Sequence, residues 1–344
     1  AMKHPRLYSE NPFLCSVREA SLPEPTADGL LVASRCSAIS AGTEMLIFQG
    51  RFPDHMALDA TLPGYAGKPF AYPLAYGYAG VGRVVAAGPK ADPAWIGRRV
   101  FGFQPHQSHF AVPAAEVIPV PDGVADEDAA FLAAMETAVN LVMDGRPLVG
   151  ERVLLLGQGV VGLLTTAVLA RFPLAALAVL ERWPKRRQAA LELGAGAAWG
   201  GDEEDWEKKA AAVFHPEAAD GGADLVFELS GRPASLDTAI AWAGFDGRVV
   251  VGSWYGTKTA PIDLGGRFHR NRLRLISSQV STIAPALSGR WRKPRRLAAA
   301  WDLIARVRPS RLVTHRFGIE EAQQAYEQLN DQPGETLQVL LTYG

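Results

Sequence analysis

The stretch VLLLGQGVVG, residues 153–162, decides the fold. An apolar run is followed by the spacing Gly-x-Gly-x-x-Gly and then by a helix-like segment that continues to Arg171. In a strand–turn–helix unit, the first glycine permits a tight turn and the second lets a pyrophosphate approach the helix N-terminus. The third lets the helix pack on the sheet. Cofactor contacts are therefore predicted at Gly157, Gln158, Gly159, Val160, Val161 and Gly162.

An acidic residue follows the next predicted strand. The run LAVL ends at Glu181, 19 residues beyond Gly162, where a carboxylate accepts hydrogen bonds from the adenosine ribose. This residue favours NAD, because a 2′-phosphate would meet like charge. NADP stays open, because Arg182, Lys185 and Arg186 could neutralise that phosphate, although the solvated first turn of a helix is the favoured interpretation of these residues.

Further predicted strands alternate with helical segments in the same way. The runs DLVFEL (224–229) and RVVVG (248–252) are separated by helical segments, which is typical of a parallel sheet with helices on both faces. A dinucleotide lies at the carboxyl ends of such strands. This places four more predicted cofactor contacts at Ser230, Gly231, Gly252 and Ser253.

The remaining chain has a different pattern. Up to about residue 130, short β-type runs alternate with Gly and Pro, which predicts a compact, mostly antiparallel β domain. The chain ends in an amphipathic helix, IEEAQQAYEQL, and a strand, LQVLLTY, that are expected to return to this domain. The sequence thus predicts an α/β protein: a β domain from residues 2–134 and 279–344, and a doubly wound parallel sheet from residues 135–278.

Composition limits the function. The 344 residues are 48% hydrophobic and 21% charged, with a formal net charge of -1, so nothing indicates nucleic acid as a partner. Cys15 and Cys36 are the only cysteines, too few for a disulfide framework, and a reduced cytoplasmic setting is expected. Arg171 and Pro173 interrupt the longest apolar run, so no membrane span is predicted.

The chain resembles the medium-chain dehydrogenase/reductase superfamily over nearly its full length. The likeness rests on GYAGVGRVVAAG (77–88), GRRV (97–100), PVPDG (119–123), LELGA (191–195) and the glycine-rich turn. It implies a Rossmann domain joined to a GroES-like catalytic domain. The motifs SAGTE (40–44) and META (135–138) look most like a zinc-free branch related to bacteriochlorophyllide a dehydrogenase. The resemblance also implies that Thr137 contacts the cofactor and that residues 272–276 pair two subunits into a homodimer.

Three departures from the zinc-dependent members concern the metal. Where those enzymes bind zinc, this chain is expected to have Ala41, Tyr78 and Ala133; a slip of one residue would place Ser40 at the first position. None of these residues suits tetrahedral zinc, so no metal is predicted. His106 and His109 form a rival pair, but no third ligand stands nearby in sequence, and ordinary polar loop residues are the favoured interpretation.

The resemblance implies an NAD(P)(H)-dependent oxidoreductase without zinc. Thr43 and Tyr78 would handle the substrate proton and Glu44 would hold the turn. An activated secondary alcohol or its ketone is the expected substrate; reduction of a conjugated C=C bond and a dinucleotide sensor without turnover are the alternatives. The substrate could be large and aromatic or conjugated if Tyr65, Phe70, Tyr72, Tyr76, Trp254 and Tyr255 wall a pocket rather than fill a core.

One basic cluster allows two interpretations. Five residues between 290 and 296 carry it: Arg290, Arg292, Lys293, Arg295 and Arg296. A solvated surface is the usual role of such a cluster, and an anionic part of the substrate is the functional alternative.

Overall fold

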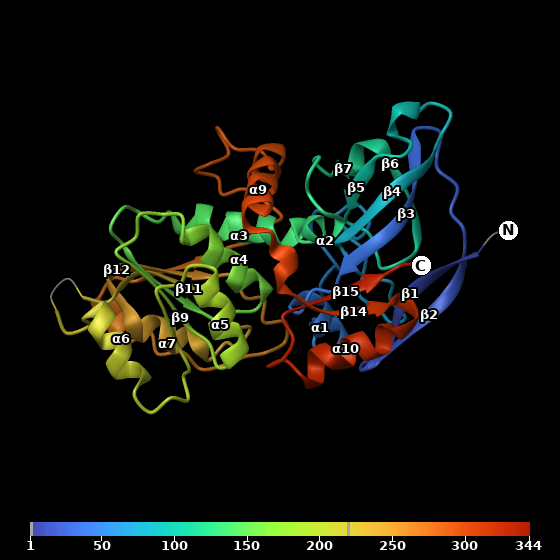
Figure 1. Cartoon of the computed structure of the whole chain (residues 1–344). Helices are drawn as coiled ribbons and strands as arrows, with labels where there is room; N and C mark the ends of the chain where they lie inside the picture. The colour runs from blue at the N-terminus through green and yellow to red at the C-terminus, as the bar shows by residue number, and fades with distance from the viewer. Residues whose placement is uncertain (1–2, 219–220) are drawn as a thin grey trace. The chain divides into compact units, whose positions relative to one another are not determined.

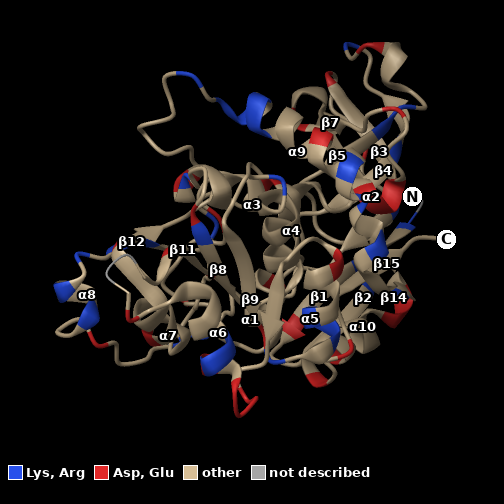
Figure 2. Ribbon diagram, turned by 60° about the vertical axis from the view of Figure 1, so that its left-hand side comes forward, with Lys and Arg blue, Asp and Glu red and all other residues tan. Residues whose placement is uncertain are grey.

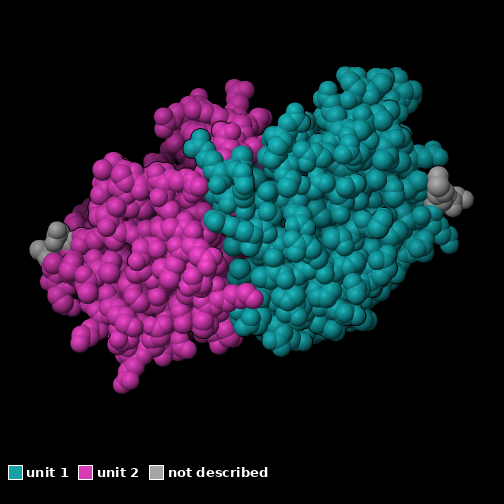
Figure 3. Space-filling view, in the orientation of Figure 1, with its two compact units in different colours: residues 1–133, 304–344 teal, residues 134–303 magenta. Residues whose placement is uncertain are grey.

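The structure is a computed structural model that describes residues 3–218 and 221–344. Met2, the expected first residue of the β domain, lies outside the described residues. The chain divides into two compact units, which Figure 3 distinguishes by colour. Unit 1 contains residues 1–133 and 304–344, and unit 2 contains residues 134–303.

Unit 2 is built on a six-stranded sheet in which every neighbouring pair is parallel (Figure 1). Its strands are β8 (Arg152–Leu156), β9 (Ala176–Leu180), β10 (Ala197–Trp199), β11 (Ala223–Glu228), β12 (Ala243–Val251) and β13 (Arg274–Ser277). Their order, β10-β9-β8-β11-β12-β13, runs outward in both directions from β8 and β11. The predicted doubly wound parallel sheet is thereby confirmed, and its switch point lies where those two strands end.

Helices lie between these strands along the chain or flank them. They are α3 (Leu132–Gly145), α4 (Val160–Leu169), α5 (Pro184–Glu192), α6 (Trp206–Phe214), α7 (Ser235–Trp242), α8 (Arg267–Arg270) and α9 (Lys293–Val307). Phe214 of α6 and Ile240 of α7 pack in one apolar cluster with Leu154 and Val226 of the sheet. Nearly every residue of α4 is buried, because its sequence is apolar all round.

Unit 1 contains a mainly antiparallel sheet of order β14-β15-β3-β4-β5-β7, with β6 also paired to β3. Its strands are β3 (Gly29–Ala38), β4 (Gly80–Ala87), β5 (Arg99–Gly102), β6 (His109–Pro113), β7 (Ile118–Pro119), β14 (Val313–Gly318) and β15 (Gln338–Thr342). The antiparallel pair β1 (Lys3–Asn11) and β2 (Leu14–Ser21) forms a separate small sheet. Because β15 pairs with β3, residues from both ends of the sequence share one sheet, as the sequence predicts.

Short helices complete unit 1. They are α1 (Thr43–Phe48), α2 (Asp126–Ala129), α10 (Ala322–Asp331) and the 3-10 turns η1 (Pro93–Trp95), η2 (Ala114–Glu116), η3 (Pro309–Leu312) and η4 (Ile319–Glu321). Phe48 of α1 and Tyr326 of α10 pack together with their rings 5.3 Å apart. The described residues include no helix that is both long enough and apolar enough to cross a membrane.

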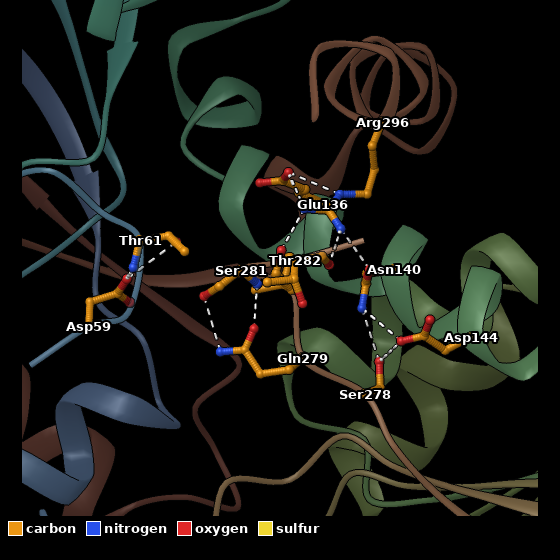
Figure 4. A network of polar contacts seen from close by, with 11 residues as sticks. Asp59, Thr61, Glu136, Asn140, Asp144, Ser278, Gln279, Ser281, Thr282 and Arg296 are labelled. Carbon is orange, nitrogen blue, oxygen red and sulfur yellow. Dashed lines mark hydrogen bonds and ion pairs between the residues drawn. The ribbon is translucent and has the colours of Figure 1, made fainter. Parts of the chain in front are cut away.

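The boundary near residue 280 differs from the expected one. Residues 279–303 belong to unit 2, whereas the sequence pattern assigned them to the β domain. The reason is Arg296, whose guanidinium binds the Glu136 carboxylate at 2.9 Å and the Asn140 side chain at 2.6 Å (Figure 4). It also donates to the backbone carbonyls of Val280 and Thr282. These bonds attach the segment after β13 and the start of α9 to α3.

The basic cluster therefore has two parts. Figure 2 shows Lys and Arg along the segment that enters α9, and Arg290, Arg292 and Arg295 are exposed there. Arg296 is only 1% exposed. Its assignment to a solvated surface is wrong, because a buried guanidinium requires a charged partner and full hydrogen bonding, and Glu136 with three oxygen acceptors supplies both.

Candidate functional site

The glycine-rich turn of unit 2 has the geometry that a dinucleotide site requires. Gly157 adopts φ +90°, and a Cβ there would lie 2.5 Å from the Cα of Ser230. A Cβ on Gly162 would lie 2.3 Å from the carbonyl oxygen of Gly157. Gly159 precedes the first residue of α4, and a Cβ there would meet no atom within 4 Å. The fold thus requires glycine at positions 157 and 162. Gly159 instead faces open space, where a pyrophosphate could approach.

Gln158 supports this turn from inside. Its side chain is fully buried; the amide nitrogen donates to the carbonyl of Gly157 at 3.0 Å and the amide oxygen accepts from Thr166 at 2.9 Å. The first intrahelical bond of α4 runs from Leu163 N to Gly159 O. The N–H groups of residues 160–162 therefore have no acceptor within the helix and are suited to bind an anion.

Glu181 joins the ends of two strands. It is buried, and its two carboxylate oxygens accept from the backbone N–H of Gln158 at 2.7 Å and of Trp183 at 2.9 Å. Each carboxylate oxygen has a second lone pair, so ribose hydroxyls could still bind. The predicted ribose acceptor thus lies beside the glycine-rich turn, and it also holds that turn in place.

The basic residues after Glu181 differ in their surroundings. Arg182 is exposed and stacks over the Trp183 ring at 4.5 Å. Burial lowers the pKa of Arg186, and the charge of Glu181 acts in the opposite direction. Arg187, which the sequence did not single out, donates to the carbonyls of Glu181 and Arg182 at 2.9 Å each.

The carboxyl ends of β11 and β12 meet through Glu228. This fully buried carboxylate accepts from the backbone N–H of Ser230 at 2.8 Å, from its hydroxyl, and from the Tyr255 hydroxyl at 2.5 Å. Ser253 accepts from Gly231 N at 2.9 Å, and Gly252 N donates to the carbonyl of Glu228 at 3.0 Å. The four residues predicted to contact the cofactor therefore lie together. The sequence reasoning missed Glu228; the signal that could have identified it is an acidic residue inside the apolar run DLVFEL.

Thr137 lies on α3, directly after the buried Glu136. Its side chain is partly exposed. Its role toward a cofactor stays a prediction.

Glu44 is the polar centre of unit 1. It is 2% exposed, and its Oε1 accepts from Ser40 N at 2.9 Å. Its Oε2 accepts from the Tyr326 hydroxyl at 2.5 Å and bonds His106 Nε2 at 2.8 Å. The Glu44 carboxylate therefore holds the turn that carries Thr43.

Tyr78 and Thr43 come together through this turn. Hydrogen bonding connects the Tyr78 side chain with Ser40 and Thr43, and Thr43 N donates to Ser40 Oγ at 3.3 Å. Burial, assisted by the charge of Glu44, raises the pKa of Tyr78 to about 12. The phenol is therefore protonated at neutral pH and acts as a hydrogen-bond donor rather than a base.

Four aromatic residues of the loop before β4 belong to an apolar core cluster of unit 1. Tyr65 and Tyr76 are buried in a cluster with Ile47, Phe52 and Leu58, against which Phe70 and Tyr72 pack. These rings fill space between the loop and α1. The structure thus supports the core interpretation of these four aromatic residues.

The resemblance places Ala41, Tyr78 and Ala133 where zinc-dependent members bind their metal. Ala41 and Ala133 have no donor atom, and the Tyr78 phenol is protonated. In residues 3–218 and 221–344, no three His, Cys, Asp or Glu side chains gather closely enough to hold a metal ion. His106 is occupied by Glu44 and Ser37, and His109 bonds Ser108 at 3.0 Å.

Comparison with known proteins finds similarity to several dehydrogenases. The family described as zinc-binding dehydrogenase matches residues 160–304. An L-threonine 3-dehydrogenase of Bacillus licheniformis is 28% identical over 217 residues, which cover 63% of this chain. The match spans only 58% of that relative's length.

Two solved structures share the whole fold. One is described as a short chain alcohol dehydrogenase from Escherichia coli complexed with NADH; it is 19% identical with a TM-score of 0.79, and 99% of this chain and 100% of that chain are covered. The other, described as a zinc-binding dehydrogenase from Sinorhizobium meliloti bound to NADP, is 21% identical with the same TM-score and coverage. These comparisons support the resemblance to the medium-chain dehydrogenase/reductase superfamily that the glycine-rich turn and the motifs around it indicate.

Proposed function

We propose that this protein is an NAD(P)(H)-dependent oxidoreductase that works without catalytic zinc and transfers hydride between nicotinamide and an activated secondary alcohol or its ketone. The observation that carries the proposal is the hydroxyl group of Tyr78, hydrogen-bonded with Ser40 and Thr43 where zinc-dependent relatives are expected to hold their metal. Unit 2 supplies the cofactor cradle and unit 1 the proton donor.

The protonation state of Tyr78 favours the reductive direction. In carbonyl reduction, hydride from the nicotinamide adds to the carbonyl carbon while a proton must reach the carbonyl oxygen. A phenol with a pKa of about 12 holds that proton at neutral pH and donates a hydrogen bond to the oxygen as negative charge develops. The Thr43 hydroxyl, on the same turn, would orient the oxygen or relay the proton.

NADH is the proposed cofactor. Glu181 is buried at the position of the ribose acceptor, where a 2′-phosphate would meet its charge. Arg182 and Arg186 keep NADP as the second possibility. The cofactors named for the two solved structures, NADH and NADP, divide in the same way.

A reductase panel tests the reaction. Purified protein would be mixed with NADH or NADPH and with ketones, conjugated enones or quinones, and cofactor absorbance followed. Formation of an alcohol from a ketone is the expected result. A saturated ketone from an enone would instead assign the conjugated-alkene reductase, because the same phenol can stabilise an enolate oxygen. Cofactor binding without turnover across the panel would favour a dinucleotide sensor.

Independence from zinc has its own test. Protein purified without added metal should contain no stoichiometric zinc by elemental analysis, and a chelator should leave turnover unchanged. Zinc bound in stoichiometric amount at the Tyr78 turn would overturn this part of the proposal.

A homodimer is the proposed assembly. The edge strand β13 pairs only on its β12 side in the described sheet, and Leu275 on it is 38% exposed. An unpaired edge can add a strand from a second copy. Light scattering should give twice the monomer mass, and Leu275→Lys should shift the equilibrium toward monomer. A monomeric mass for the parent protein would contradict the assembly.

A further inference from the structure

A chain of buried hydrogen bonds crosses unit 1 through His106. Its Nε2 bonds Glu44 Oε2 at 2.8 Å, its Nδ1 bonds Ser37 Oγ at 2.6 Å, and Ser37 Oγ bonds the Tyr343 hydroxyl at 2.7 Å. His106 is 1% exposed and Ser37 is 2% exposed. The free-energy cost of burying these polar side chains is offset because each of them is hydrogen-bonded to another.

The donor and acceptor of each hydrogen bond in this chain are assigned by starting from the Glu44 carboxylate, which can only accept. Glu44 Oε2 also accepts from Tyr326, so the carboxylate is the acceptor for His106 Nε2–H. With a neutral imidazole, the Nδ1 lone pair accepts the Ser37 hydroxyl proton, and the Tyr343 hydroxyl donates to Ser37. The order Ser–His–Glu has the connectivity of a nucleophilic triad, but a serine this deeply buried and already bonded to Tyr343 cannot reach a substrate.

His106 also binds the segment that leads to Tyr78. Its backbone N–H donates to the carbonyl of Tyr76 at 3.3 Å. A Cβ on Gly77 would lie 2.9 Å from the imidazole Cδ2 and Nε2, so the backbone of Gly77 packs directly on the ring. The Tyr65 hydroxyl fixes the same backbone by donating to the Gly77 carbonyl at 2.7 Å.

Two segments far apart in sequence are thus joined by one residue, through its imidazole and its backbone N–H. Through Glu44, His106 reaches the turn of Ser40 and Thr43; through Tyr76 and Gly77, it reaches Tyr78. We propose that His106 is a positioning residue that, through its Nε2–H bond to Glu44, holds the Thr43 turn and the Tyr78 segment in register for proton transfer. The catalytic part of this inference rests on the proposed oxidoreductase function.

Two substitutions separate the two ring nitrogens. The amide nitrogen of Gln lies about where Nε2 does, so His106→Gln can keep the bond to Glu44. The shorter Asn places its amide near Nδ1, so His106→Asn can keep only the contact with Ser37. His109→Asn is the matched control, because His109 bonds Ser108 and lies outside the buried chain.

The turnover experiment uses the best substrate of the reductase panel. His106→Asn should lower kcat by about 10- to 100-fold, the scale of one hydrogen bond to a charged group. KM and the NADH dissociation constant should stay within about twofold, because cofactor contacts lie in unit 2. His106→Gln should recover most of kcat, and His109→Asn should match the parent. A purely structural role would lower the unfolding midpoint without this difference between Gln and Asn.

Hydrogen exchange provides a measurement that needs no substrate. The amide of Ser40 donates to Glu44 Oε1, so it should exchange about tenfold faster or more in His106→Asn, together with peptides spanning residues 74–80. Exchange in unit 2 should not change. If His106→Asn does not fold, Glu44→Gln serves instead, since it removes the charge that Nε2–H binds and should give the same pattern.

The outcomes are separable. Parental kcat and exchange in His106→Asn would overturn the proposal, as would equal impairment of His106→Gln and His106→Asn. If the parent protein turns over no substrate, the proposed oxidoreductase function fails, and the exchange comparison alone decides whether His106 holds the two segments.

Discussion

The carbonyl oxygen of Gly157 lies 2.3 Å from the position that a Cβ of residue 162 would occupy. The first turn of α4 packs so closely against the end of β8 that residue 162 has no room for a side chain. Gly162→Ala should therefore destabilise the protein by about 1–3 kcal/mol. Gly159→Ala meets no atom within 4 Å and should unfold at the parent's urea midpoint.

Gly159→Ala should affect cofactor binding rather than stability. Because Gly159 faces the space that a pyrophosphate would occupy, its Cβ should weaken NADH binding about tenfold or more. Fluorescence titration of NADH and urea unfolding of both variants are the measurements. NADH binding by Gly159→Ala at the parent's affinity would place the pyrophosphate elsewhere.

Glu181 should set the preference between the two cofactors. Glu181→Ala should weaken NADH binding by about 1–3 kcal/mol, because it removes ribose acceptors and releases the Gln158 and Trp183 N–H groups. NADPH affinity should fall less, or rise, since the like charge disappears. Glu204→Ala, an exposed carboxylate of the same unit, is the control. Equal affinity of the parent for both cofactors would show that the neighbouring arginines prevail.

Tyr78 should be needed for proton transfer but not for cofactor binding. Tyr78→Phe removes only the hydroxyl and should lower kcat by about 10²–10⁴-fold, the usual contribution of a general acid. Thr43→Val should lower kcat as well. Because the pKa of Tyr78 is about 12, carbonyl reduction should show no loss from its ionisation between pH 7 and pH 10.

Steady-state kinetics of these variants, with NADH affinity measured beside them, test that role. Parental turnover in both variants would mean that the proton travels by another route. Reduction of a conjugated alkene would then be the better account.

Stability should decline in alkali because of the buried thiols. Burial raises the pKa of Cys15 and of Cys36 from 9.0 to about 12. Since the folded pKa exceeds the unfolded value, the stabilisation is complete below about pH 9 and is lost as pH rises toward 12. Each cysteine should contribute about 2 kcal/mol of the loss between pH 7.5 and pH 10.5.

Urea unfolding at those two pH values gives the measurement. Cys36→Ala should be less stable than the parent at pH 7.5 but should lose less stability at pH 10.5. The same pH slope in parent and variant would show that the Cys36 thiol does not ionise on unfolding.

Much of unit 2 was predictable because its determinants are local. The spacing of Gly157, Gly159 and Gly162 after an apolar strand specifies a tight turn and a close helix–sheet contact, whatever the rest of the chain does. Glu181 follows from the next strand end for the same reason. The strand runs before Ser230 and Ser253 also place those residues at one edge of the sheet, because carboxyl ends of parallel strands share one edge.

The partners of buried charges were decided by tertiary structure alone. Arg296 lies 160 residues from Glu136, and within a basic run its sequence gives no sign that it is buried. His106 and Glu44 are 62 residues apart, and Tyr326 joins them from near the other end of the chain. A local pattern reports which backbone conformation is favoured, whereas burying a charge depends on which distant side chains the fold brings within hydrogen-bond distance. The sequence alone therefore determined the glycine-rich turn of the proposed cofactor cradle, and the folded chain determined what surrounds Tyr78.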